Sequence, residues 1–290
     1  MNARMTIDPR SVDWNNVVAS SYRISQTFRY EYPEPITHLR HRLVISPRER
    51  HGDQRRVSHD VIIRPDVPAR LQTDAFGNDV VAVHADRVDR HISFTLDCVV
   101  TRDRRSGAHL VDDSHADQPA YRERRRLTTP DAALADTAAD LRRAYGDAHE
   151  RAHAISAFVH DAMVYTKDET DVFTTAAQAF ATRRGVCQDY AHVAISIARA
   201  SGLAARYVSG HLLGEGATHA WFEIFVPDGL TTRVIALDPT HGCGVDLRYV
   251  VIAVGRDYDD VAPTSGIFTG RAGGKLSAEQ RVDLTNVTAA

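Results

Sequence analysis

The sequence predicts an α+β protein, with an N-terminal antiparallel β-sandwich-like domain followed by helices packed on a second antiparallel sheet. Three observations indicate this. Residues 21–100 hold short β-branched and aromatic runs separated by prolines and a Gly77-Asn78 turn. Residues 129–201 change to the 3.6-residue spacing of amphipathic helices. Residues 204–239 return to strand-like runs, so helices and strands are segregated along the chain, as in the α+β class.

Five or six short strands are expected in the first region. The run "SYRISQTFRYEY" (21–32) alternates in character, as a strand with one buried face does. Similar runs follow at 39–47, 59–65, 78–85 and 91–100. The turn residues between them favour hairpins, and such a series predicts a sandwich or half-barrel in which Cys98 is a core residue.

Four helices are expected next. The first, within 128–147, has Thr129 as its N-cap candidate. The second, within 149–163, carries its apolar residues on one helical stripe, and the third lies within 174–185. The fourth begins near Cys187. The strands expected after the helices are 204–212, 219–226 and 233–239, with another within 250–258.

The chain of 290 residues divides into three expected parts: a polar leader over 1–20, an N-terminal β-rich domain over 21–120, and a second domain over 121–290. The boundary is placed in the charged, irregular stretch 101–127. Hydrophobic residues make up 43% and charged residues 25% of the chain, which is ordinary for a globular protein with a full core.

Composition excludes several classes of protein. A formal net charge of -3, with arginines mixed among acidic residues, gives no electrostatic case for nucleic acid. Because no apolar segment is long enough for a membrane span and Met1–Trp14 has no signal-like core, we expect a cytoplasmic protein with no membrane partner. Three cysteines do not suggest a disulfide framework. The sequence does not determine the oligomeric state, and it is compatible with a homo-oligomer.

The stretch "RRGVCQDYAH" (183–192) places Cys187 between a basic glycine turn and the start of the fourth helix. A helix N-terminus beside positive charge favours the thiolate, which is the nucleophilic form of cysteine. Gly185 lets the backbone turn tightly, so that the sulfur lies at the mouth of the turn. The alternative is that Cys187 packs as a small hydrophobic residue, as free cysteines commonly do.

Two residues further along the chain favour the catalytic interpretation. His219 begins one expected strand and Asp238 ends the next, and the spacer between these strands is long enough for a hairpin. Antiparallel neighbours would bring the two side chains together. A helix carrying Cys187 against that hairpin would complete a Cys–His–Asp line, in which the imidazole takes the thiol proton and the carboxylate orients the ring.

At this point the sequence resembles a known family. "GVCQDYAH" (185–192), "SGLAARYVSGHL" (201–212), "HAW" (219–221) and "DPT" (238–240) occur in the order and spacing of the bacterial transglutaminase-like superfamily. This resemblance covers residues 125–270. The β-rich part, with "DAFGND" (74–79), resembles the N-terminal region that accompanies this core in bacterial members.

The resemblance implies a papain-like core, with Cys187 as nucleophile, His219 as base and Asp238 as orienting carboxylate. It also implies activity on amide bonds through a thioester, as a protease, an amidase or an acyltransferase, although some members are inactive binding modules. The expected partner is a protein or peptide substrate with a glutamine or other amide group. No cofactor and no calcium dependence are expected. His241 departs from the family pattern, which often has Asn there.

Three more residues are candidates for the oxyanion or substrate site. The backbone N–H of Cys187 is the natural first oxyanion donor, and Gln188 or Tyr165 is a candidate for the second. Trp221 shares a strand face with His219 and could shield it from water. Each of these side chains has an ordinary packing or surface role as its alternative.

A competing interpretation is a zinc metallopeptidase. "HERAH" (149–153) matches the H-E-x-x-H motif, in which His149 and His153 bind zinc and Glu150 is the general base. The helical pattern argues against it, because the histidines fall on a polar stripe rotated away from the apolar one.

Overall fold

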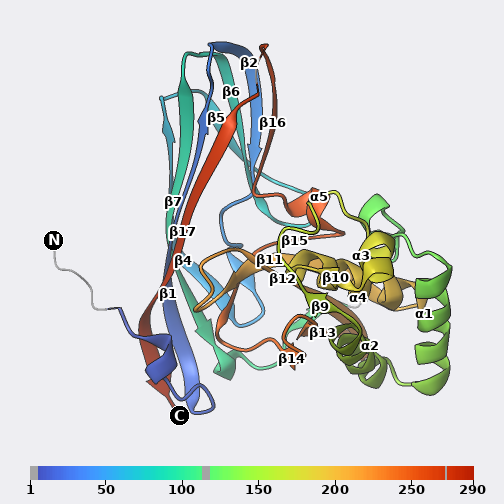
Figure 1. The fold of residues 1–290 in the computed structure, drawn as a ribbon. Coiled ribbons are helices and arrows are strands. Elements are labelled where there is room, and N and C mark those ends of the chain that lie inside the picture. Colours follow the sequence, from blue (N-terminus) through green and yellow to red (C-terminus); the bar gives the residue numbers. More distant parts are fainter. Residues whose placement is uncertain (1–5, 113–117, 272) are drawn as a thin grey trace.

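The computed structural model describes residues 6–112, 118–271 and 273–290. A tall β-sandwich stands beside a second unit, in which helices pack on a separate sheet (Figure 1). This arrangement confirms the predicted α+β class. Among the described residues, no helix is long and apolar enough to cross a bilayer.

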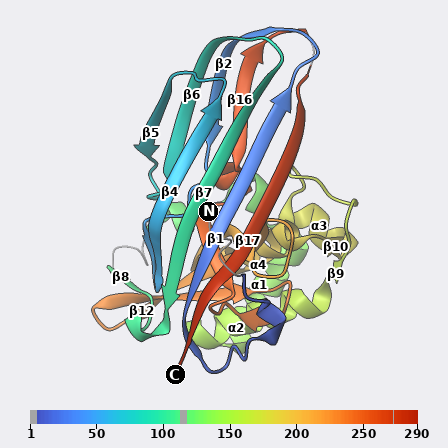
Figure 2. The ribbon, with the colours of Figure 1, turned by 90° about the vertical axis from the view of Figure 1, so that its left-hand side faces the viewer.

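Two antiparallel sheets form the sandwich (Figure 2). The first sheet has the order β17 (Lys275–Ala289), β1 (Val17–Glu31), β7 (His91–Asp103), β4 (Gln54–Arg64), β3 (Arg50–His51). The second has the order β16 (Thr264–Thr269), β2 (Ile36–Leu43), β6 (Asp79–Val88), β5 (Ala69–Thr73). The alternation predicted from the sequence is clearest in β7, where every second side chain from Ile92 to Val100 is fully buried, Cys98 included.

The C-terminal segment returns to the sandwich, which differs from the expected division at 120/121. β17 pairs antiparallel with β1 along nearly its whole length, and β16 pairs with β2. The expected leader over 1–20 also overlaps the sheet, because β1 begins at Val17. Strand pairing between distant segments has no local sequence signal, which is why neither feature was predicted.

The second unit is built on a sheet of order β14-β13-β12-β11-β15, with β8 added beside β13. Its strands are β8 (Leu110–Asp112), β11 (Ala204–Leu212), β12 (His219–Asp228), β13 (Thr231–Asp238), β14 (Cys243–Gly244) and β15 (Tyr249–Gly255). A two-stranded bridge joins β9 (Val164–Tyr165) and β10 (Arg184–Gly185). The predicted strands 204–212, 219–226 and 233–239 are all present.

Helices α1 (Ala132–Ala144), α2 (Ala148–Ala162), α3 (Ala176–Thr182), α4 (Cys187–Ala200) and α5 (Tyr258–Val261) complete the unit. The prediction of Thr129 as the first cap was wrong: Asp131 is the N-cap, and its carboxylate accepts from the Leu134 N–H at 2.9 Å. α4 lies at the centre of the unit, packed on the other three long helices and on β11 and β12, and residues 188–199 are all buried. The helix that begins with Cys187 is therefore held on every side.

Two side-chain amides join the sandwich to the second unit at the edge strand β15. Gln54 donates to Val251 O and accepts from Val251 N, both at 2.8 Å. Asn78 does the same with Val254, at 2.7 and 2.9 Å. Each amide satisfies the unpaired donor and acceptor that a sheet edge would otherwise expose. The "DAFGND" turn therefore has a structural role, because it presents Asn78 to β15.

Candidate active site

The turn before α4 fixes the position of Cys187. Val186 is the N-cap, and the Asp189 carboxylate accepts from the Val186 N–H at 2.8 Å and from the Thr170 hydroxyl at 2.7 Å. A Cβ on Gly185 would lie 2.4 Å from that carboxylate, so no larger residue fits without displacing it. Cys187 is the first residue of α4, and the first N–H groups of a helix have no carbonyl partner in a preceding turn.

The neighbouring bridge brings Tyr165 to the same place. In the parallel pairing of β9 with β10, Tyr165 lies opposite Gly185, two residues before Cys187. The Tyr165 ring is about half exposed, and its pKa is raised by burial and by the nearby Cys187. The tyrosine suggested by the sequence is therefore close to the thiol, and its role as an oxyanion donor stays a prediction.

His219 and Asp238 meet as the predicted hairpin requires. β12 and β13 pair antiparallel, and the Nε2 of His219 donates to Asp238 Oδ2 at 2.7 Å. Both side chains are almost entirely buried. Because Nε2 is engaged by the carboxylate, Nδ1 is the ring atom left to exchange a proton with a neighbour.

The charges around His219 favour its protonated form. Burial would lower the pKa of this imidazole, but the hydrogen bond to Asp238 and the closeness of the Cys187 sulfur outweigh burial and raise the pKa to about 10. Burial would likewise raise the pKa of Asp238, yet hydrogen bonds from His219 and His241 hold it well below its usual value. The His219 imidazole is therefore positively charged, and it is hydrogen-bonded to an Asp238 carboxylate that stays ionised.

The structure adds two partners of Asp238 that the sequence did not predict. His241 Nδ1 donates to Asp238 Oδ2 at 2.7 Å, and the Tyr249 hydroxyl donates to the same oxygen at 2.9 Å. His241 was visible in the sequence only as a departure from a family pattern. Tyr249 comes from β15, and no local signal connects it with Asp238.

Glu215 is a further acidic neighbour that sequence reasoning missed. Its carboxylate oxygens lie 3.4 Å from His219 Nδ1 and 3.2 Å from His241 Nε2. Its side chain is 42% exposed, so it lies at the entrance to the site and not in the buried part. Glu215 therefore contacts the one ring nitrogen of His219 that Asp238 leaves free.

A cleft of about 470 Å³ joins these groups. The residues that line it include Cys187, His219, Tyr165, Lys167, Glu215, Thr240 and His241. Gln188 and Trp221 are not among them. Gln188 is buried and its amide donates to Val172 O at 3.2 Å, so the structure does not bring this predicted side chain to the cleft.

Trp221 instead lies behind the histidine. It is fully buried, and its ring is nearly parallel to that of His219, with centroids 6.1 Å apart. A Cβ on Gly210 would come within 2.5 Å of the indole, so this glycine leaves the space that Trp221 fills. The position agrees with a shield that keeps water from the buried side of His219.

Among the described residues, no further side chain joins the H-E-x-x-H motif to complete a metal site. His149, Glu150 and His153 lie on the exposed face of α2, with the two histidine rings 4.7 Å apart. Within 6–112, 118–271 and 273–290, the groups of three or more side chains with metal-ligand spacing are two others: His219-Asp238-His241, and His51-His109-Glu223. The zinc alternative therefore has no third ligand here.

The geometry thus places a partly exposed thiol and a protonated imidazole in one cleft, with the buried Asp238 carboxylate hydrogen-bonded to the imidazole. A thiol in such a line can attack a carbonyl carbon, and the imidazole can pass a proton to a leaving group. The sequence predicted all three residues, and the structure brings them together.

Two family models match the chain. Residues 135–236 match a model described as the transglutaminase-like superfamily, and residues 22–101 match one described as the bacterial transglutaminase-like N-terminal region. The first match includes Cys187 and His219 and ends two residues before Asp238.

Similar proteins include uncharacterized mycobacterial relatives. One, from Mycobacterium tuberculosis, is 30% identical over 276 residues, which is 85% of this chain and 87% of the relative. Another, from Mycobacterium leprae, is 35% identical over 133 residues, which is 42% of this chain and 45% of the relative. A crystal structure of a candidate cysteine protease from Cytophaga hutchinsonii superposes with a TM-score of 0.70 at 20% identity, covering 94% of this chain and 93% of that one.

Proposed function

The chain belongs to the transglutaminase-like superfamily, and from that premise we propose that it is a cysteine enzyme that acts on amide bonds. The observation that supports this most strongly is the His219–Asp238 pair beside a partly exposed Cys187 in one cleft. Cys187 is the nucleophile, His219 exchanges the proton and Asp238 orients the ring. The substrate is a protein or peptide that offers a glutamine or another amide.

In the first half of the reaction a thioester forms. The Cys187 thiol gives its proton to His219, and the thiolate attacks the amide carbon, so that the carbon–sulfur bond forms while the carbonyl oxygen takes the negative charge. As the carbon–nitrogen bond breaks, the proton on His219 passes to the departing nitrogen, which leaves as a neutral amine. Because the pKa of His219 is raised to about 10, the ring holds this proton at neutral pH.

In the second half the thioester is resolved. A water molecule or an incoming amine attacks the same carbon, His219 accepts its proton, and the carbon–sulfur bond breaks. Water gives hydrolysis, and an amine gives a new amide. We propose hydrolysis as the main outcome, because water needs no second binding surface beside the cleft.

The oxyanion of each intermediate needs hydrogen-bond donors. The backbone N–H of Cys187 lies at the start of α4, where helical N–H groups are free and the helix dipole favours negative charge. The Tyr165 hydroxyl is the second donor we propose, since this ring lines the cleft beside Cys187. Gln188 is a weaker candidate, because its amide is bound to Val172 O.

Alkylation tests the nucleophile directly. We expect iodoacetamide to modify Cys187 of the native protein at least tenfold faster than Cys98 or Cys243, as measured by peptide mass spectrometry. Cys98 is fully buried, and Cys243 is partly exposed with a hydroxyl as its neighbour, so the chain supplies two internal controls. Equal rates at Cys187 and Cys243 would count against an activated thiol.

A panel of glutamine and peptide amides then tests the reaction. We expect a covalent acyl adduct on Cys187 by mass spectrometry and release of amine or ammonia in solution. Cys187→Ala should form no adduct and release nothing, whereas Cys243→Ala should behave as the wild type. Turnover by Cys187→Ala at the wild-type rate would remove the proposed mechanism.

A further inference from the structure

A second cavity lies where the sandwich meets the core sheet. It has a volume of about 400 Å³ and is lined by basic side chains from both units, chiefly Arg48, Arg50, His51, His109 and Arg206. An adjoining cavity of about 170 Å³ shares His51 and His109 with it and reaches Glu223. Neither cavity shares a lining residue with the cleft around Cys187.

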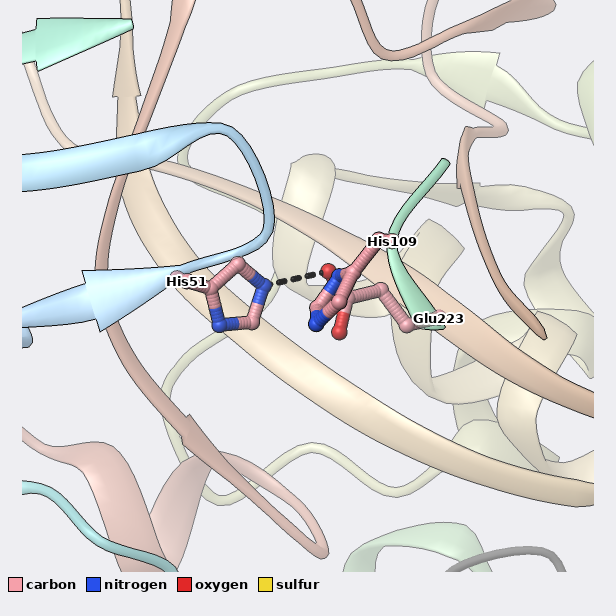
Figure 3. A group of neighbouring side chains, drawn as sticks. All are labelled: His51, His109 and Glu223. Atoms are coloured by element: carbon pink, nitrogen blue, oxygen red, sulfur yellow. Dashed lines mark hydrogen bonds and ion pairs between the residues drawn. The ribbon is translucent and has the colours of Figure 1, made fainter. Parts of the chain in front are cut away.

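Both oxygens of the carboxylate at the centre of this cluster already accept a hydrogen bond. Glu223 accepts from His51 Nε2 at 2.7 Å through one oxygen and from Arg206 Nε at 2.6 Å through the other. Figure 3 shows the His51 and His109 rings converging on Glu223 from separate segments of the chain. Glu223 therefore balances the charge of Arg206, and it has no second charge to offer the remaining arginines.

Arg48 forms no ion pair with the described residues, although Glu223 and Asp74 lie near enough to attract its charge. Its Nε and Nη1 atoms are shielded from solvent and have no hydrogen-bond partner in the described part of the chain. The nearby Asp74 is engaged by Arg42 at 3.3 Å and by the amide of Asn78 at 3.0 Å. Buried guanidinium groups are normally paired with anions, because leaving one unpaired is costly. The lining of the cavity therefore carries more positive than negative charge.

The positive charge of the cavity lining determines which class of ligand the cavity can bind. His51, His109 and Glu223 have the spacing of metal ligands, with their ligand atoms within 4.8 Å of one another. A divalent cation there would face Arg48 and Arg206, which repel it. A planar guanidinium instead matches the two oxygens of a carboxylate or phosphate.

We propose that this cavity binds a small oxyanion, a carboxylate or a phosphate group, which pairs with Arg48. Arg50, at the exposed rim, adds a second positive charge, and His109 supplies a ring N–H. The site is separate from the catalytic cleft, although His219 and Glu223 lie on the same face of β12, about 13 Å apart along the strand. The inference does not depend on the proposed catalytic activity.

Thermal unfolding and titration calorimetry with the full chain test this. The probes are potassium phosphate and potassium acetate, each compared with potassium chloride at equal ionic strength, so that the two oxyanions are distinguished from each other and from salt. We expect at least one oxyanion to raise Tm by several degrees in a saturable way. Cys187→Ala should keep the whole shift, because the catalytic cleft is not involved.

Arg48→Met should abolish the oxyanion-dependent shift and weaken binding at least tenfold, whereas the control Arg55→Met, at an exposed position on β4, should leave both unchanged. In chloride alone, Arg48→Met should be no less stable than the wild type, because it removes a partly buried charge that has no ion-pair partner. A purely structural role for Arg48 predicts the opposite sign.

If Arg48→Met does not fold, Arg50→Met provides the test, since Arg50 is exposed and its loss should weaken binding several-fold. Four results would overturn the proposal: no shift with either oxyanion, equal shifts in wild type and Arg48→Met, unchanged affinity in Arg50→Met, or a shift with zinc chloride in place of the oxyanions. The last result would assign the cluster to a metal.

Discussion

Two buried clusters in this protein each set a carboxylate between two histidines. In the cleft, Asp238 accepts from His219 and His241, both at 2.7 Å. At the junction with the sandwich, Glu223 accepts from His51 at 2.7 Å and has His109 beside it. The histidines nevertheless differ in charge. The pKa of His219 is raised to about 10, whereas burial lowers the pKa of His51 and lowers that of His109 to about 4.

The surrounding charges account for this difference. Around Asp238, burial would also lower the pKa of the imidazole, but the hydrogen bonds of His219 with that carboxylate and with Cys187 outweigh burial, so the ring of His219 carries the positive charge. Around Glu223, burial outweighs the attraction of that carboxylate, and the positive charges of Arg206 and Arg48 lower the pKa of both imidazoles further, so the imidazoles stay neutral. The same residue types thus give a protonated histidine in one cluster and a neutral one in the other.

The largest effect should come from removing the charge of Asp238. Asp238→Asn keeps the shape but loses the anion that orients His219 and stabilises its positive ring, so we expect kcat to fall by roughly 10⁴-fold. The loss of Tm should be modest beside this. Amide turnover and thermal unfolding of the same preparation measure both. A loss of activity below tenfold would show that the Asp238 charge is unimportant.

The equivalent change in the second cluster should act on stability instead. Glu223→Gln leaves Arg206 buried without its partner, and we expect it to lower the free energy of unfolding by about 3–5 kcal/mol. Activity per folded molecule should change only a few-fold, because Glu223 does not line the cleft. Urea unfolding measures the loss of stability, and amide turnover measures the change in activity. A Glu223→Gln variant that is fully folded but inactive would contradict this expectation.

The two clusters should respond to pH in opposite directions. The native pKa of His109 lies below the unfolded value of about 6.5, so its contribution to stability is present above pH 6.5 and is lost as pH falls toward 4. The native pKa of His219 lies above the unfolded value, so its contribution is present below pH 6.5 and is lost as pH rises toward 10.

Urea unfolding between pH 4 and pH 10 checks this for the wild type and two variants. His109→Gln should make the acid side of the stability profile less steep and leave the alkaline side unchanged. His219→Gln should do the reverse. Identical profiles in the two variants would show that the clusters do not differ in protonation.

The smallest effect should come from the outer histidine of the cleft. His241→Asn removes one of three donors to Asp238 Oδ2, and the other two remain. Losing one hydrogen bond to a charged group corresponds to roughly a tenfold fall in kcat. Steady-state kinetics beside a Cys243→Ala control measures it. If kcat fell as far as it does in Asp238→Asn, His241 would be as important to the reaction as His219.

Much of the site could be predicted because its signals are local. A glycine turn before a helix gave Cys187, and two strand termini separated by a hairpin gave His219 and Asp238, as the structure has them. Tyr165 was only a candidate by analogy, with a packing or surface role as its alternative, and it lines the cleft. Gln188 was suggested only by adjacency, and helix geometry turns its amide to Val172.

The sequence by itself determined the segregation of strands and helices, the central helix and the residues that meet at its start, because each depends on periodicity or turn chemistry within a few residues. Only the tertiary structure decided that β17 returns to pair with β1, that Tyr249 reaches Asp238, and that two nitrogens of Arg48 are shielded from solvent without a partner. These features join segments far apart in the chain, and their energies depend on burial and on neighbouring charges. Neither burial nor the neighbours' charge is set until the sheets have packed.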